Sequence, residues 1–190
     1  MPARSLTLRL ADEAATAALG ASLAEALLAM APEVRRQGCN IGLMGDLGAG
    51  KTSLVRALLR RAGVAGAVKS PTYALLEPYE LSRLNFYHFD FYRFKVPEEF
   101  QDRGFAEYFG RGAVCLVEWP ERAAGVMPPI DLSISLQVEA APGPGDPASA
   151  HHAETGAQPA RNARLLAGTE IGERCLQELT GARQSCSDGA

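Results

Sequence analysis

Apolar and polar residues follow regular patterns along most of the chain, and these patterns predict both strands and helices. Strict alternation indicates a half-buried strand, and a short continuous apolar run indicates a strand buried on both faces. These patterns predict strands at residues 5–10, 39–44, 84–90, 113–118, 131–138 and 163–167, and an extended segment at 68–79. Apolar spacing together with start and stop signals predicts helices from Asp12 to a stop at Pro32, over 51–62, from Pro97 to a break at Gly104, and over 169–179.

Strands that alternate with helices are typical of an α/β protein with a largely parallel sheet. The last two predicted strands flank residues 140–159, which are rich in Ala, Pro and Gly and hold His151 and His152. We interpret 140–159 as a flexible insertion at the tip of an antiparallel C-terminal hairpin. The chain length of 190 residues suits one domain, which we place at 1–183, with 184–190 as a frayed terminus.

Residues 45–52 read Gly-Asp-Leu-Gly-Ala-Gly-Lys-Thr and match the phosphate-binding P-loop pattern G-x-x-x-x-G-K-[ST]. The predicted strand before them and the predicted helix after them are the context that a P-loop needs. Its glycines let several backbone N–H groups face one anion at a helix N-terminus, where the dipole favours negative charge. Lys51 would reach the β- and γ-phosphates, and the Thr52 hydroxyl would bind Mg²⁺.

Two apolar strands end in a carboxylate, Asp90 and Glu118. The carboxyl ends of parallel strands line the crevice that also holds a P-loop, so both acids are candidates for binding the metal or orienting the attacking water. Each acid has a plainer interpretation: Asp90 as a turn or capping residue, and Glu118 as the partner of another buried group. The sequence leaves open which of them orients water.

Between the P-loop helix and the Asp90 strand, Ser70-Pro71-Thr72 occupies the place of a switch loop whose hydroxyls contact Mg²⁺ or the γ-phosphate. A plain Ser-Pro turn is the alternative. His88 shares a strand face with Asp90, although a lone strand histidine is more often structural. Arg93 either neutralises phosphate charge or pairs with an acid.

Composition narrows the functional classes. The formal net charge is −3 with only three lysines, which argues against a protein that binds RNA or DNA strongly on its own. The guanine-reading pattern N-K-x-D is absent, which favours ATP or weak selectivity for the base. Four scattered cysteines without a C-x-x-C pair predict reduced thiols. Because the chain has neither an apolar run of membrane-spanning length nor a signal-peptide core, we expect a cytoplasmic protein.

We expect Tyr73, Tyr79, Tyr87 and Tyr92 near the site, as packing residues or for adenine stacking.

Five ordered motifs together closely resemble the bacterial TsaE (YjeE) family, the ATPase of tRNA threonylcarbamoyladenosine biosynthesis. They are the P-loop at 45–52, Lys-Ser-Pro-Thr-Tyr at 69–73, Leu-Glu-Pro-Tyr at 76–79, Tyr-His-Phe-Asp-Phe-Tyr-Arg at 87–93, and Leu-Val-Glu-Trp-Pro at 116–120. The resemblance implies a P-loop three-layer α/β sandwich that hydrolyses ATP weakly alone. It also implies work with the TsaB–TsaD pair, which modifies adenosine 37 of tRNA, so that tRNA is reached only through the complex.

The resemblance further implies roles for individual residues. ATP would be bound by Leu47, Gly48, Ala49, Gly50, Lys51 and Thr52, with Ser70 and Thr72 in a switch-like loop and Glu13 near the nucleotide. Thr52 and Glu118 would contact Mg²⁺, and Asp90 would be needed for hydrolysis, alongside Lys51 and Glu118 as catalytic groups. Two other functions stay open: a non-hydrolytic, nucleotide-gated assembly factor, and a small-molecule P-loop kinase.

Overall fold

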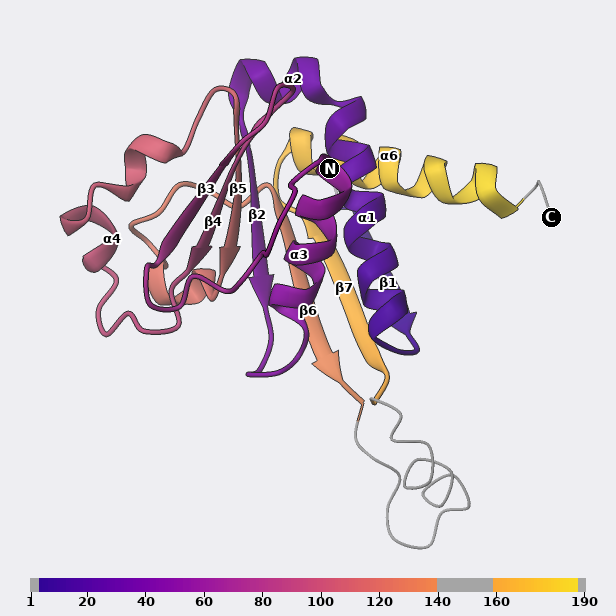
Figure 1. Ribbon diagram of the computed structural model, residues 1–190, viewed down its shortest axis with the longest axis horizontal. Coiled ribbons are helices and arrows are strands. Elements are labelled where there is room, and N and C mark those ends of the chain that lie inside the picture. The colour runs from indigo at the N-terminus through magenta and orange to yellow at the C-terminus, as the bar shows by residue number, and fades with distance from the viewer. Residues whose placement is uncertain (1–3, 140–158, 188–190) are drawn as a thin grey trace, which may run out of the picture.

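A computed structural model of the chain describes residues 4–139 and 159–187, with 182–187 described by their backbone alone. Within these ranges the strands form one seven-stranded sheet (Figure 1). The strands are β1 (Ser5–Leu10), β2 (Cys39–Met44), β3 (Leu76–Glu80), β4 (Asn85–Asp90), β5 (Ala113–Glu118), β6 (Leu132–Val138) and β7 (Arg161–Ala167). The helices are α1 (Glu13–Ala29), α2 (Ala31–Gln37), α3 (Lys51–Ala62), α4 (Glu99–Asp102) and α6 (Glu170–Ser187), with the 3₁₀ turns η1 (Phe105–Tyr108) and η2 (Pro120–Ala123).

The sheet has the order β1-β7-β6-β2-β5-β4-β3. β2 is parallel to both β5 and β6, and β4 is parallel to β5, whereas β7 and β3 run against their neighbours. The predicted α/β class with a largely parallel sheet is therefore confirmed, as is the antiparallel C-terminal hairpin of β6 and β7. Val138 lies opposite Arg161 in that hairpin, so the residues between them connect its two strands, although 140–158 lie outside the described residues.

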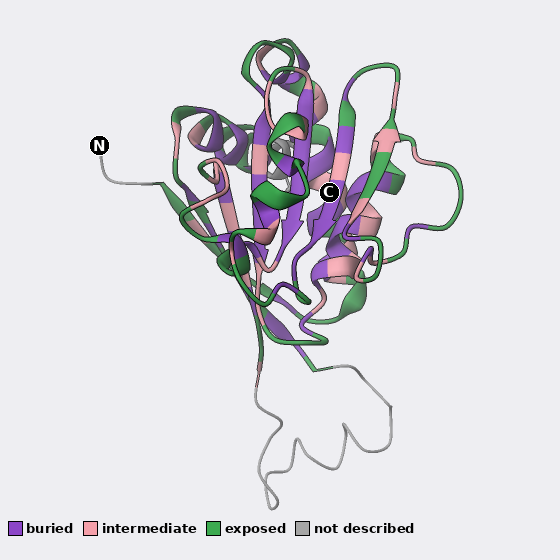
Figure 2. Ribbon diagram, turned by 90° about the vertical axis from the view of Figure 1, so that its left-hand side faces the viewer, coloured by how far each residue is buried: buried purple, intermediate pink, exposed green. Residues whose placement is uncertain are grey.

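Helices cover the two faces of the sheet unequally. Helices α1, α3 and α6 pack on one face, over a core that contains the apolar side chains of β1, β2, β6 and β7 (Figure 1). The short elements α4, η1 and η2 cover the other face beside β2, β4 and β5, over a second core dominated by phenylalanines. Figure 2 shows the central strands as the most buried part of the molecule. The layers match the predicted three-layer sandwich, with one thin outer layer.

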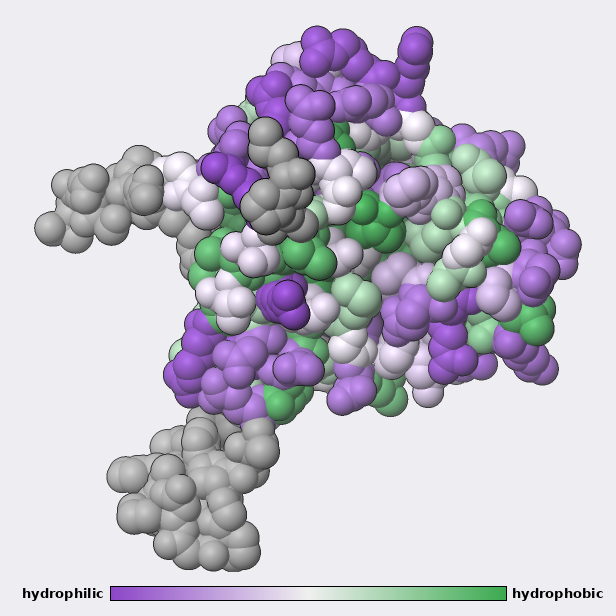
Figure 3. Space-filling view, turned by 180° about the vertical axis from the view of Figure 1, so that it is seen from behind, coloured by the Kyte–Doolittle hydropathy of each residue, from purple (hydrophilic) through white to green (hydrophobic). Residues whose placement is uncertain are grey.

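The rest of that second face is mostly polar because β1, β6 and β7 largely alternate, with Leu166 of β7 as an exposed apolar exception. Their residues facing the helices are mostly buried, and the residues between them, such as Thr7, Ser135 and Arg164, are exposed or half-buried. Seen from behind, hydrophilic residues surround an area with more hydrophobic ones (Figure 3). No single helix in the described ranges is long and apolar enough to cross a membrane, and the pair α1 and α2 that meets this measure jointly is bent by 76°.

Three predicted boundaries were wrong. Pro32 does not stop the first helix, which ends at Ala29; it stands in the first turn of α2, where proline is tolerated because its missing N–H has no helical partner. The extended segment at 68–79 is a strand only from Leu76 onward. Helix α6 passes the predicted end at 179 and reaches Ser187, so helical backbone enters the 184–190 segment that we expected to be frayed, of which 188–190 lie outside the described residues.

Candidate nucleotide-binding site

A pocket of about 320 Å³ opens where the P-loop meets the carboxyl ends of β4 and β5. The first turn of α3 and the segment at 70–72 complete its walls. This edge is where ligands bind in parallel α/β sheets, because the strand ends and the helix N-termini converge there. The pocket is lined by Leu47, Gly48, Gly50, Lys51, Thr52, Ser53, Ser70, Thr72, Asp90, Tyr92, Glu118 and Trp119.

The backbone of the P-loop adopts a conformation that depends on glycine. Gly45 has a φ of +135°, and a Cβ atom placed there would lie 2.3 Å from the carbonyl oxygen of Leu136 in β6. Gly45 thus lets the loop leave β2 in contact with the neighbouring strand. Gly48 and Gly50 also have positive φ angles, and Gly50 is the N-cap residue of α3 without a side-chain cap. The free N–H groups of the first helical turn therefore face the pocket and can bind an anion.

Lys51 folds back over the P-loop from the first residue of α3. Its ammonium group donates to the carbonyl oxygens of Gly45 and Asp46, and it lies 3.9 Å from the centre of the Trp119 ring. Burial lowers the pKa of Lys51, and the carboxylates of Glu118 and other acids oppose that shift by favouring the charged form. An ammonium group has three N–H donors, so one remains for a phosphate oxygen at the pocket.

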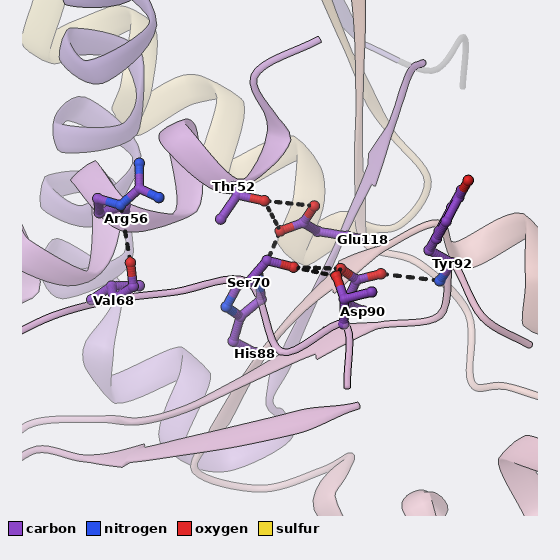
Figure 4. A network of polar contacts seen from close by, with 9 residues as sticks. Thr52, Arg56, Val68, Ser70, His88, Asp90, Tyr92 and Glu118 are labelled. Carbon is purple, nitrogen blue, oxygen red and sulfur yellow. Dashed lines mark hydrogen bonds and ion pairs between the residues drawn. The ribbon is translucent and has the colours of Figure 1, made fainter. Parts of the chain in front are cut away.

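Glu118 joins α3 to two strands (Figure 4). The Thr52 hydroxyl lies 2.8 Å from one Glu118 carboxylate oxygen and 3.0 Å from the other. His88 Nε2 lies 2.9 Å from Glu118 Oε1, which places the imidazole behind the acid in the sheet. His88 is fully buried and its Nδ1 atom has no hydrogen-bond partner among the described residues. The histidine thus orients Glu118 and does not line the pocket itself.

Asp90 organises the loop on the other side of the pocket. Its Oδ2 atom accepts hydrogen bonds from the hydroxyls of Ser70 and Thr72, each 2.5 Å away, and its Oδ1 atom accepts one from the Tyr92 backbone N–H at 3.0 Å (Figure 4). Asp90 and Glu118 are direct neighbours in the parallel register of β4 and β5. The two carboxylates are 2% and 3% exposed, so the site concentrates buried negative charge beside Lys51.

Three other predicted residues lie outside the pocket lining. Ala49 does not line the pocket, because its side chain is buried in the main core. Glu13 also lies outside the pocket lining, but it accepts a hydrogen bond of 3.3 Å from Ser53, which is one of the lining residues. Arg93 stacks on the ring of Tyr73, at 4.3 Å, and does not line the pocket.

The expected cluster of tyrosines at the site is wrong in part, since only Tyr92 of the four lines this pocket. Tyr87 packs against Tyr108 on the far side of the sheet.

Sequence reasoning also missed Trp119 and Arg161 as parts of the site. Trp119 follows Glu118 in a left-handed conformation (φ +59°), which turns its ring over Lys51. Arg161 supports the P-loop from β7, and no local sequence pattern marks it.

The donor set suits Mg²⁺ carried by a nucleotide. Mg²⁺ prefers oxygen ligands and is usually held by one or two carboxylates together with phosphates and water. Thr52 and Glu118 supply a hydroxyl and a carboxylate within 3 Å of each other. The described residues contain no group of three or more His, Cys, Asp or Glu side chains that could hold a metal ion. Phosphates would therefore have to complete the coordination, which fits the position of the P-loop.

Comparisons with known proteins agree with each other. Residues 10–143 match the family model described as threonylcarbamoyl adenosine biosynthesis protein TsaE. The chain is 36% identical over 176 residues to the tRNA threonylcarbamoyladenosine biosynthesis protein TsaE of Haemophilus influenzae, covering 93% of this chain and 98% of that protein. The Bacillus subtilis protein of the same name is 38% identical over 95 residues, or 50% of this chain and 59% of that protein. The crystal structure of Bacillus subtilis YdiB has the same fold, with a TM-score of 0.64 at 23% identity over 96% of this chain and 99% of that one.

Proposed function

The chain belongs to the TsaE family, whose members are named for threonylcarbamoyladenosine biosynthesis in tRNA, and from this premise we propose that it binds and hydrolyses ATP with Mg²⁺ in that pathway. One observation carries the proposal: the Thr52 hydroxyl contacts the Glu118 carboxylate at the mouth of a P-loop. A P-loop hydroxyl beside a strand-end carboxylate is the arrangement that holds the nucleotide's metal in P-loop NTPases.

Each group would have a distinct role. The N–H groups of the P-loop and the Lys51 ammonium would bind the β- and γ-phosphates, and Thr52 with Glu118 would hold Mg²⁺. The bound ion would neutralise phosphate charge. Positioning and electrostatic stabilisation then supply most of the acceleration, because phosphoryl transfer demands little covalent chemistry from the protein.

We assign the orientation of the attacking water to Asp90. Glu118 already contacts Thr52 and His88 on the metal side, whereas Asp90 faces the hydroxyls of Ser70 and Thr72 across the pocket. In this proposal the loop at 70–72 senses the γ-phosphate, because its hydroxyls bind the same carboxylate that orients the water. Hydrolysis would then release the loop, as in switch segments of other NTPases.

The pathway proposal includes protein partners. We infer that the protein acts with a TsaB–TsaD pair and reaches tRNA through that complex. Its net charge of −3 supports an indirect route, since direct binding to the phosphate backbone relies on clustered lysine and arginine.

Calorimetry with ATP and Mg²⁺ tests the site. Lys51→Ala should remove most ATP affinity, whereas Lys95→Ala, which truncates an exposed lysine outside the pocket, should leave it unchanged. Glu118→Gln should keep binding ATP in EDTA and lose the gain in affinity that Mg²⁺ gives the wild type. Wild-type affinity in Lys51→Ala would refute the P-loop assignment.

A nucleotide-gated assembly factor is the second candidate, because the hydrogen bonds of Asp90 to Ser70 and Thr72 couple a loop to the pocket. In that case ATP binding alone would switch partner affinity. The Glu118→Gln protein separates the two functions. If it binds ATP, does not hydrolyse it and still supports tRNA modification at the full rate, hydrolysis is dispensable.

A further inference from the structure

We propose that Arg161 is a positioning residue for the phosphate site, acting through the peptide group between Ala49 and Gly50. The inference rests on the proposed binding of ATP at the P-loop. Arg161 begins β7, more than a hundred residues after the P-loop in the sequence, yet its Nε atom donates a hydrogen bond of 3.0 Å to the Ala49 carbonyl. A role in phosphate binding follows from the direction in which that bond holds the peptide.

Arg161 is itself held firmly. It is 6% exposed and lies between β1 and β6 in the sheet, opposite Leu10 on one side and Val138 on the other. Its Nη1 atom also donates to the Pro159 carbonyl at 3.3 Å. The planar guanidinium has a fixed fork of donors, so its burial and its second bond, to Pro159, restrict the direction of the hydrogen bond that reaches Ala49.

Because the peptide bond between Ala49 and Gly50 is trans, fixing the Ala49 carbonyl also fixes the direction of the Gly50 N–H. In a trans peptide the carbonyl and the following N–H point in opposite directions, and the described residues contain no cis peptide bond. Arg161 holds the Ala49 carbonyl on the core side of the loop. The N–H of Gly50 therefore points away from the core, and Gly50 lines the pocket whereas Ala49 does not.

Lys51 and Arg161 thus bind different carbonyl groups of the P-loop. Lys51 holds the carbonyls of Gly45 and Asp46, and Arg161 holds that of Ala49. The Ala49 N–H donates to the Asp46 carbonyl at 3.1 Å, and the other N–H groups between these carbonyls are left for the ligand. The contact is close: a Cβ atom on Gly50 would lie 3.3 Å from Arg161 Nε, so the glycine lets the loop rest directly on the guanidinium. A guanidinium also stays charged when buried, and its positive charge favours an anion across the loop.

Arg161→Met tests the proposal, because it keeps the length of the side chain and removes its donors. Arg164→Met is the matched control, since Arg164 lies on the same strand but is exposed on the opposite face. We expect Arg161→Met to raise the Kd for ATP about ten- to a hundredfold, the usual cost of one charged hydrogen bond. The loss should be equal with Mg²⁺ and with EDTA, because the defect concerns phosphate and not the metal. Arg164→Met should bind as the wild type does.

A merely structural role would lower the melting temperature of Arg161→Met without changing the Kd of the folded protein, and that result would overturn the proposal. Should Arg161→Met not fold, Arg161→Lys decides, because it keeps the charge without the Nε donor. We expect a weaker Kd and a smaller ATP-induced shift of the Gly50 amide resonance in Arg161→Lys; wild-type values of both would overturn the inference. A wild type that does not bind ATP refutes the proposed function itself, whereas tight binding by both wild type and Arg161→Met refutes only the role of Arg161.

Discussion

Substituting alanine at two glycines of the P-loop separates steric demand from backbone strain. Gly45 has a φ of +135°, and an added Cβ atom would lie 2.3 Å from the Leu136 carbonyl oxygen. That oxygen belongs to the backbone of β6 and cannot move freely, because Leu136 is paired with Ala163 in β7. Gly48 has a φ of +80°, but an added Cβ atom would meet nothing within 4 Å.

The magnitudes follow from these contacts. Alanine at either position has a conformational cost of about 1–3 kcal/mol, offset by about 0.4–1 kcal/mol from the smaller entropy of the unfolded chain. Only Gly45→Ala adds a displacement of packed backbone, which costs about 1–3 kcal/mol more, as overpacking does in cores. We therefore expect Gly45→Ala to lower the free energy of unfolding by roughly 1–6 kcal/mol and Gly48→Ala by about 3 kcal/mol or less, with Gly45→Ala the more costly by about 1–3 kcal/mol.

Urea denaturation of both variants beside the wild type measures the difference directly. A loss in Gly45→Ala at least about 1 kcal/mol larger than in Gly48→Ala supports the reasoning, because both substitutions strain a residue with positive φ but only Gly45→Ala adds a clash with packed backbone. Equal losses would refute it, since the contact between the P-loop and β6 would then carry no energetic weight.

Three further variants or measurements probe the rest of the molecule. Phe91→Ala should lower the free energy of unfolding by about 3–5 kcal/mol in urea, because Phe91 is fully buried and stacks within the second core; a loss below about 1 kcal/mol would contradict that packing. Arg9→Ala breaks an exposed ion pair and should change the free energy of unfolding by less than about 1 kcal/mol; a larger loss would show that the pair is not merely a surface contact. Burial raises the pKa of the Cys39, Cys115 and Cys175 thiols, so alkylation should modify them slowly in the native protein and rapidly in urea. Peptide mapping after alkylation measures this, and rapid labelling of the native protein would contradict their burial.

The parts of the fold that local sequence determines could be predicted closely. The predicted helix at 51–62 coincides with α3, because its apolar stripe and the glycines at both ends are local signals. Asp90 and Glu118 were expected to meet because each ends an apolar strand, and they are neighbours in the sheet register. Buried parallel strands carry both the pattern and the direction that such an inference needs.

The parts that depend on distant contacts could not be predicted. Arg161 reaches the P-loop because β7 lies between β1 and β6. The hairpin with β6 was expected, but the pairing with β1 and the contact with Ala49 depend on residues far away in the sequence. The segment before Leu76 resembles a strand in sequence, but Ser70 and Thr72 bond to Asp90 in place of a strand neighbour. Tyr87 was expected near the site, but it lies three residues before Asp90 in β4, and strand residues an odd number apart face opposite sides of the sheet.

Hydrolysis of ATP, measured with and without an added TsaB–TsaD pair while threonylcarbamoyladenosine is followed over several turnovers, tests the proposed function most directly. We expect Mg²⁺-dependent hydrolysis that the partners stimulate, repeated rounds of tRNA modification, and loss of both in Lys51→Ala. ATP binding without any partner effect, or modification that proceeds equally well with Lys51→Ala, would contradict it.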